Sequence, residues 1–244
     1  MLQDIHQASL VQRYPLGLRY AVGERVYRYA RAGGTLVPDM GVKNALTQHI
    51  GPTRAIAVAL AGASTIDLTV GATDGVAGNG AIAANELVGG HIVIFCAGLT
   101  AAINRGIKRN TAVSAPGGAM TVTLDKPLSI TLPIGSTGEC IASLYRNVQN
   151  DVIGWHPVVG LPTLAATVNQ YLWLQTWGPI WMAAQLTVGV GVNNMQVVFR
   201  ADGSLGMHDP VVVDGQYAQH AGYVMADMPA GAQGAPFVYL QIAP

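Results

Sequence analysis

Charged residues are scarce in this chain of 244 residues: 11% are Asp, Glu, Lys or Arg, with 13 acidic and 13 basic side chains. Ordinary domains carry about 25% charged residues, which keep the surface of a monomer hydrated. A chain with few charges and a formal net charge of zero tends to associate at neutral pH. We therefore expect other subunits to cover much of its surface. The alternative is a surface rich in small Ala and Gly residues.

Motifs that mark enzymes are also missing from the sequence. There is no Gly-x-Ser-x-Gly nucleophile motif. The glycine-rich segments 71–80 and 189–193 lack the spacing and the lysine of a phosphate-binding loop. A pair of carboxylates brought together by the fold stays open, although only three glutamates are present: Glu24, Glu86 and Glu139. We predict a protein that is not an enzyme and needs no cofactor.

Cysteine and long apolar runs are rare as well. Cys96 and Cys140 lie in apolar stretches without metal-type spacing. We interpret both as buried free thiols, compatible with a reducing compartment, with a single disulfide as the alternative. Asp4 and His6 interrupt the place where the apolar part of a secretion signal would begin. No run approaches the roughly 20 apolar residues of a membrane span, so no membrane partner is expected.

One group of possible metal ligands is close in sequence: His208, Asp209, Asp214 and His220. A metal centre needs three or four ligands that converge on one point. Asp209 precedes a Pro and Asp214 precedes a Gly, and both dipeptides are typical of turns. Turn chemistry accounts for the aspartates, so no metal site is predicted.

Short strand-like stretches alternate with clusters of Gly, Asn, Asp and Pro, and no long amphipathic helix pattern is present. This arrangement indicates an all-β fold, a sandwich or barrel of short antiparallel strands with an extended N-terminal arm. The clearest stretches are residues 55–60, 65–70, 91–96, 119–124, 197–200 and 237–242. The last of these echoes residues 171–175, which suggests two similar, half-buried strands that lie side by side.

The charge distribution and composition suggest how the chain is divided. Residues 1–150 carry 12 Lys and Arg against 8 Asp and Glu, whereas residues 151–244 carry one Arg against five Asp. The front is net +4 and the rear net −4, which suits head-to-tail packing of copies. We predict an N-terminal arm or edge segment (1–34), a β domain (35–158), and a second β part (159–244) that stands alone or belongs to the same domain.

The richest aromatic stretch, residues 171–183, carries four large rings: Tyr171, Trp173, Trp177 and Trp181. Its residues alternate as in a strand, and Gly178-Pro179 in the middle excludes a helix. We expect Gly178-Pro179 to bend or bulge the chain, with a strand, a bend and a second strand as the preferred arrangement. The rings are expected to anchor a core or a subunit contact, with Trp177 largely buried.

Residues 13–31 combine five arginines with four tyrosines. Pro15 and Gly17 keep the segment from being a regular helix, and Arg and Tyr are enriched at protein–protein contacts. We expect an extended arm that a partner buries, by pairing with a sheet edge. A solvated edge strand and a stacking surface for single-stranded nucleic acid are the second and third alternatives. The candidate contact residues are Arg13, Tyr14, Arg19, Tyr20, Arg25, Tyr27, Arg28, Tyr29 and Arg31.

Several segments resemble parts of tailed-bacteriophage virion proteins. Residues 86–94 (Glu-Leu-Val-Gly-Gly-His-Ile-Val-Ile) look like the "elvGGyivi" segment of those proteins. Residues 159–162 followed by 171–179 look like their "vGv…YfWlQtwGp" segment. Shorter likenesses lie at residues 27–34, 124–128 and 145–147. The family indicated is that of capsid cement or decoration proteins, which has no catalytic residues to carry over.

The resemblance implies a structural virion protein that binds the outside of a phage capsid and stabilises it. Its partners would be the major capsid protein and sibling copies, as a dimer or trimer, without nucleic acid. It would be made in the bacterial host cytoplasm and reside on the capsid surface. Two alternatives stay open: another virion component (head-fibre base, head–tail connector or tail protein), and a carbohydrate-binding β module that uses Trp173, Trp177 or Trp181 as stacking platforms.

Overall fold

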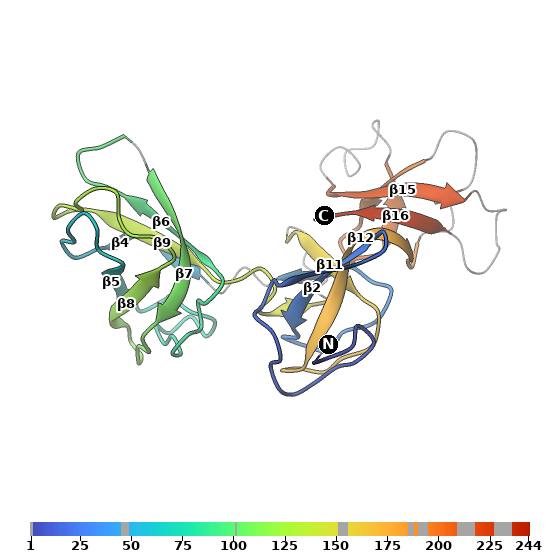
Figure 1. Cartoon of the computed structure of the whole chain (residues 1–244), viewed down its shortest axis with the longest axis horizontal. Coiled ribbons are helices and arrows are strands. Elements are labelled where there is room, and N and C mark those ends of the chain that lie inside the picture. Colours follow the sequence, from blue (N-terminus) through green and yellow to red (C-terminus); the bar gives the residue numbers. More distant parts are fainter. Residues whose placement is uncertain are drawn as a thin grey trace. The chain divides into compact units, whose positions relative to one another are not determined.

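The computed structural model describes residues 2–44, 49–100, 102–150, 156–184, 188–189, 195–208, 218–226 and 236–244. Regular structure in these ranges is β throughout, so the all-β prediction is confirmed. The chain forms two compact units, each built on a curled antiparallel sheet (Figure 1). None of the described residues belongs to a helix that could cross a membrane.

The strands of the described residues are β1 (Arg19–Val22), β2 (Arg25–Arg31), β3 (Val42–Asn44), β4 (His49–Ala55), β5 (Thr65–Val70), β6 (His91–Phe95), β7 (Ala102–Asn110), β8 (Gly118–Leu124), β9 (Thr137–Ile141), β10 (Val148–Gln149), β11 (Val158–Pro162), β12 (Tyr171–Trp181), β13 (Gln196–Phe199), β14 (Leu205–Met207), β15 (His220–Ala226) and β16 (Phe237–Gln241). Five of the predicted stretches coincide with strands to within one residue at each end. Residues 55–60 do not form the predicted strand. Strand β4 ends at Ala55, and the next residues make only isolated bridges, at Ile56 and Ala59.

Unit 1 contains both ends of the chain, residues 1–45 and 144–244. Its sheet runs β10-β3-β11-β12-β16-β15-β13-β14, with β2 attached to β12 and β1 attached to β2. The central strand β12 pairs antiparallel with β2, β11 and β16. The echo between residues 171–175 and 237–242 thus belongs to neighbouring strands, as expected.

The boundaries of the units differ from those predicted at 34/35 and 158/159. Strand β2 is a full partner of β12, so the N-terminal segment belongs to the same sheet as the C-terminal third. Residues 46–143 form unit 2, which is inserted between β3 and β10. Those two strands pair with each other, Val148 opposite Asn44 and Gln149 opposite Lys43. Unit 2 therefore leaves and rejoins unit 1 at adjacent points.

Unit 2 has the strand order β4-β9-β6-β7-β8-β5. Its two end strands meet where Ile56, directly after β4, bridges to Leu68 of β5, and where the Ala57 amide donates to the Asp67 carbonyl at 2.9 Å. The sheet thus curls back onto itself around an aliphatic core. Cys96 and Cys140 are buried in this core and unpaired. Burial, with smaller contributions from nearby carboxylates, raises the pKa of the Cys140 thiol to about 12.

Candidate assembly surface

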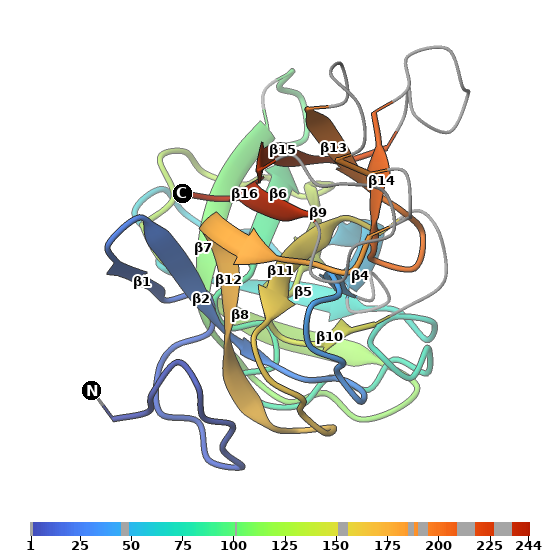
Figure 2. The ribbon, with the colours of Figure 1, turned by 90° about the vertical axis from the view of Figure 1, so that its right-hand side faces the viewer.

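Strands β1 and β2 form a hairpin with the two-residue turn Gly23-Glu24, since Val22 lies opposite Arg25. Gly23 has a φ of +56°, the left-handed conformation that such turns require. All four residues of β1 are exposed. Within the described residues β1 pairs with β2 alone, so it is an open edge of the sheet (Figure 2).

The other edge of β2 pairs with β12 in a register that places Tyr29 opposite Trp173 and Tyr27 opposite Gln175. Tyr27 and Tyr29 are two residues apart and share one face of the strand. Both are completely buried. Two groups of residues that the sequence singled out separately, the front tyrosines and the aromatic stretch, therefore meet in one sheet.

The rings on this face form a compact group, which we call the Trp173 cluster: Tyr14, Tyr20, Tyr29, Tyr171 and Trp173. The Tyr29 ring meets Trp173 edge-on, with centroids 5.0 Å apart, and stacks on Tyr171 at 6.0 Å. Tyr14 and Tyr20 tilt against Trp173 at 5.3 Å and 5.6 Å. Such pairs contribute about 0.5–1.5 kcal/mol each beyond their buried area, so the cluster is a stabilising centre of unit 1.

The N-terminal segment before β1 is tied to this cluster through Gln3, which is buried. The Gln3 side-chain amide donates to the carbonyls of Gln7 and Tyr171, both at 2.8 Å. Its Oε1 accepts from the Tyr29 hydroxyl at 2.6 Å, and its main-chain carbonyl accepts from Trp173 Nε1 at 3.2 Å. Gln3 was missed in the sequence because a single polar residue near a chain end belongs to no periodic pattern.

Tyr27 and Tyr29 are thus buried inside their own unit, contrary to the expectation that a partner is needed to bury them, whereas Tyr14 is half-buried and Tyr20 is exposed. Burial raises the pKa of Tyr29, and it raises the pKa of Tyr27 in spite of the nearby Arg25, which acts in the opposite direction. Both phenols therefore stay protonated at neutral pH. Tyr29 needs its proton to donate to Gln3.

The arginines of the segment lie closer to the solvent: Arg13, Arg19 and Arg25 are exposed, and Arg28 and Arg31 are half-buried. The Arg28 guanidinium donates to the carbonyls of Gly17 at 3.4 Å and Pro244 at 2.9 Å. Arg31 donates to Asn169 Oδ1. No carboxylate side chain in the described part of the chain forms an ion pair with any of the five. Among the described residues, the contacts of Arg28 and Arg31 are therefore to main-chain and amide oxygens, with Pro244 the last residue of the chain, and not to Asp or Glu side chains.

Strand β12 continues through Gly178-Pro179, so the expected bend between two strands is wrong. A β-bulge between Gln175 and Trp177 replaces the bend and places Trp177 opposite Val26. Val26 and Tyr27 face opposite sides of β2, so Trp177 faces away from the Trp173 cluster. The Gln175 amide donates to the carbonyls of the bulged segment, including that of Pro179 at 3.0 Å.

Beyond the bulge, alternate residues of β12, β15 and β16 form an exposed surface, which we call the outer apolar face: Trp181, Tyr223, Met225 and Phe237. These four side chains are 38–43% exposed. Trp181 lies opposite Phe237 in the register of β12 and β16. Trp177 is half-buried rather than buried, because it borders this face and donates from Nε1 to the Tyr239 hydroxyl at 3.1 Å.

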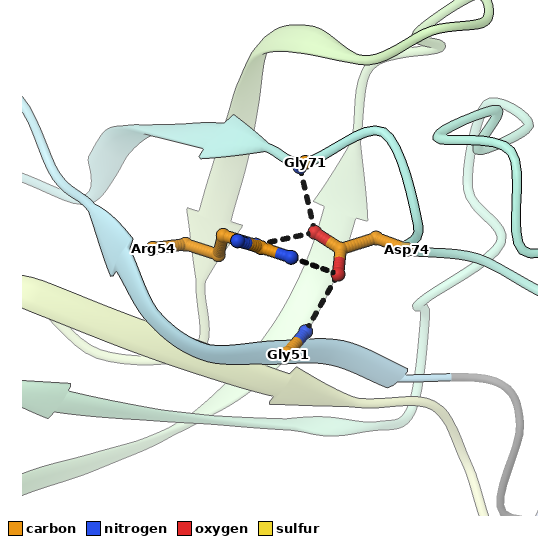
Figure 3. A network of polar contacts seen from close by, with 4 residues as sticks. All are labelled: Gly51, Arg54, Gly71 and Asp74. Atoms are coloured by element: carbon orange, nitrogen blue, oxygen red, sulfur yellow. Dashed lines mark hydrogen bonds and ion pairs between the residues drawn. The ribbon is translucent and has the colours of Figure 1, made fainter.

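A polar cluster around Asp74 lies in unit 2. Asp74 accepts hydrogen bonds from the Gly51 and Gly71 amides at 3.0 and 2.7 Å and from two nitrogens of Arg54 at 2.7 and 2.8 Å (Figure 3). Burial would raise the pKa of Asp74, but these four hydrogen bonds hold it below its ordinary value. A Cβ at Gly71 would lie 2.4 Å from Arg54 Cζ. The cluster therefore fixes the loop after β5 in place.

No metal centre forms among the described residues, which contain no group of three His, Cys, Asp or Glu side chains that could hold an ion. Of the four possible ligands grouped in the sequence, His208 and His220 are exposed, and Asp209 and Asp214 lie outside the described residues. No protein-family model, curated protein or solved structure matches the chain.

Proposed function

We propose that this chain is a structural, non-catalytic protein of a tailed-phage virion that binds the outside of the capsid and stabilises it. Its partners are the major capsid protein and sibling copies. The observation that carries the proposal is the outer apolar face, with four large side chains 38–43% exposed. A contiguous apolar surface of this kind marks a protein contact site. The likeness of residues 86–94 and 171–179 to virion proteins directs the proposal to a phage shell.

The free energy gained by covering this face is suited to a contact that is repeated many times in an assembly. About 40% of a large side chain of ~200 Å² is roughly 80 Å², which contributes about 2 kcal/mol when it is covered. Four side chains together give about 8 kcal/mol, and association itself costs about 4–15 kcal/mol. One such contact is weak alone. A lattice that engages several contacts at once through sibling copies gains from their combination.

A carbohydrate-binding module is the less favoured alternative. Trp173, one of its proposed platforms, is buried. Tyr223 and Tyr239 stack on each other with centroids 5.4 Å apart and an interplanar angle of 3°, so each ring covers one face of the other. A sugar stacks on an open ring face. The half-buried Trp177 and the exposed Trp181 are the remaining candidates among the three tryptophans.

The proposal is tested by adding the purified protein to capsids assembled without it and counting bound copies by quantitative gel and cryo-electron microscopy. Many copies per particle support a cement or decoration protein, whereas a few copies at one vertex support a connector or fibre base. No binding to the shell overturns the proposal. Light scattering of the free protein is expected to give a dimer or trimer of the 25.4 kDa chain.

Variants locate the contact. Phe237→Asp on the outer apolar face is expected to lower occupancy at least tenfold while the circular dichroism spectrum stays unchanged. Leu60→Asp, at an equally apolar but more exposed position of unit 2, is the matched control. Equal occupancy of both variants and the parent would show that the face is not the contact.

A further inference from the structure

The open edge of β1 has a defined set of backbone groups. In a hairpin with a two-residue turn, the pair that flanks the turn is hydrogen-bonded, and hydrogen-bonded pairs then alternate along the strands. Val22 and Tyr20 therefore bond to β2, which agrees with the next bond, from the Tyr29 amide to the Leu18 carbonyl at 3.1 Å. The N–H and C=O groups of Arg19 and Ala21 point away from the sheet. They form a short template for another strand, and Figure 2 shows β1 beside β2 at the edge of the sheet.

The hairpin is held in place before any partner arrives. The Tyr20 ring on β1 packs against Trp173 at 5.6 Å. The turn rests on β12, where a Cβ at Gly178 would lie only 2.4 Å from the Glu24 carbonyl oxygen. Gly178 has a φ of +93°, so glycine is required there for two reasons. An edge fixed in this way loses little freedom when another strand pairs with it.

The charge around the edge specifies the partner. Arg19 lies directly opposite Arg28 in the register of β1 and β2, and like charges in directly opposite positions destabilise a sheet. Arg25 is next to the turn and exposed. Arg28 donates to the main-chain oxygens of Gly17 and Pro244, whereas neither Arg19 nor Arg25 forms an ion pair with a carboxylate side chain of the described residues, although Glu24 lies next to Arg25 in the sequence. A carboxylate supplied from outside would relieve this repulsion and add charge-assisted hydrogen bonds.

We propose that the β1 edge accepts an extended acidic segment of another polypeptide chain, which adds a strand to the sheet at Arg19 and Ala21. A second β1 is a poorer occupant, because it brings further arginines to the same place. Nucleic acid is also poorer, because it supplies no strand for the outward backbone groups. The inference deepens the proposed function by giving the chemistry of the segment that the capsid protein inserts, and it rests on that function for the source of the segment.

Binding is measured with the full-length protein and a fluorescein-labelled probe, Thr-Val-Glu-Val-Thr-Val-Glu-Val-Thr, by fluorescence anisotropy at 50 and 300 mM salt. The control probe has Lys at both Glu positions. The acidic probe is expected to bind at least tenfold more tightly than the lysine probe, and more weakly at high salt because exposed ion pairs are screened. Equal affinity for the two probes, or no binding of either, overturns the proposal.

Three variants separate backbone pairing from charge. Ala21→Pro removes only an outward N–H, and proline is tolerated at a sheet edge. It is therefore expected to lower the affinity for the acidic probe at least tenfold. Arg19→Glu is expected to reverse the preference in favour of the lysine probe. Lys108→Glu in unit 2, an exposed site, makes the same change in net charge and is expected to bind like the parent. If Ala21→Pro misfolds by circular dichroism, the Arg19→Glu reversal decides alone.

The capsid experiment distinguishes this inference from the proposed function. If neither Ala21→Pro nor Arg19→Glu changes capsid binding, the proposed function is supported and strand addition at the β1 edge is rejected. If the protein binds the acidic probe but not the capsid, strand addition at the β1 edge is supported and the proposed function is rejected. Preferential binding of a labelled oligonucleotide that displaces the acidic probe would identify the hairpin as a nucleic-acid surface and overturn the inference.

Discussion

Tyr29 and Gln3 are joined by a hydrogen bond of 2.6 Å from the tyrosine hydroxyl to the glutamine Oε1, and both side chains are buried. This contact connects the first residues of the chain to β2, and through the Trp173 Nε1 bond to β12. The N-terminal segment is therefore part of the core of unit 1. Its removal would expose the Trp173 cluster to water.

Gln3→Ala is expected to destabilise unit 1 by about 2–3 kcal/mol, because the buried Tyr29 hydroxyl loses its hydrogen-bond acceptor and the carbonyls of Gln7 and Tyr171 lose the side-chain amide as a donor. Urea unfolding, monitored by tryptophan fluorescence, measures the change. The emission of the folded variant should shift to the red, because Trp173 becomes more exposed to solvent. Gln7→Ala, at an exposed side chain nearby, is the control and should change stability by less than about 0.5 kcal/mol.

The three tryptophans of β12 are expected to differ in their contributions. Trp173→Ala should cost about 3–5 kcal/mol, because it empties a fully buried site. Trp181→Ala should cost under about 1 kcal/mol, because the ring is exposed, and should instead weaken assembly. Trp177→Ala should fall between the two. Similar losses of stability in all three variants, measured by urea unfolding, would contradict the assignment of the rings to opposite faces.

Alkaline pH should destabilise unit 1. Burial raises the pKa of Tyr27 and Tyr29 in the folded chain, so the folded state holds these protons more tightly than the unfolded state does. This contribution to stability is fully present below the unfolded pKa, about 10, and is lost as the pH rises through the folded values. Melting temperatures measured between pH 9 and pH 11.5 should fall, and should fall less steeply in Tyr27→Phe if that variant stays folded.

Acid should act on unit 2 through Asp74. Its folded pKa is below the ordinary value, so its contribution is present above about pH 4 and is lost as the pH falls through the folded value. Asp74→Asn is expected to lower the free energy of unfolding by about 1.5–3 kcal/mol, because it replaces a charged acceptor of hydrogen bonds from Gly51, Gly71 and the half-buried Arg54. Asp67→Asn, which alters an exposed bond to Thr121, is the control. If the parent protein and Asp74→Asn unfold in acid with the same midpoint pH, this role of Asp74 is contradicted.

The sequence was informative where side chains alternate strictly. In β5, Ile66, Leu68 and Val70 are buried and the residues between them are exposed, so the local pattern alone predicts the strand. The partners of a strand are not local, and nothing in residues 25–31 indicates that β2 pairs with β12. The insertion of unit 2 also escaped prediction, because the pairing of β3 with β10 involves only two residues of each strand.

The tryptophans illustrate why the candidate surface was only partly predictable. Even spacing by four suggests that Trp173, Trp177 and Trp181 share one environment. A single bulge after Gln175 shifts the register by one residue and turns the later rings to the other side. Just after the bulge, Gly178 lies close to the main chain of Glu24, a contact across the sheet that no local pattern indicates. The sequence therefore identified the important rings but not the face that each occupies.

The insertion of unit 2 between β3 and β10 has a consequence for synthesis of the chain. Gln3 and Trp173 are 170 residues apart, so the N-terminal segment emerges from the ribosome long before β12 exists to receive it. Unit 2 is a continuous piece of the chain with its own core, and such pieces generally fold as units during translation. Tyr27 and Tyr29 stay exposed to solvent during that time, when chaperones can bind them and another nascent chain can pair with their segment. High local density of ribosomes on one message would then favour exchange of N-terminal segments between copies.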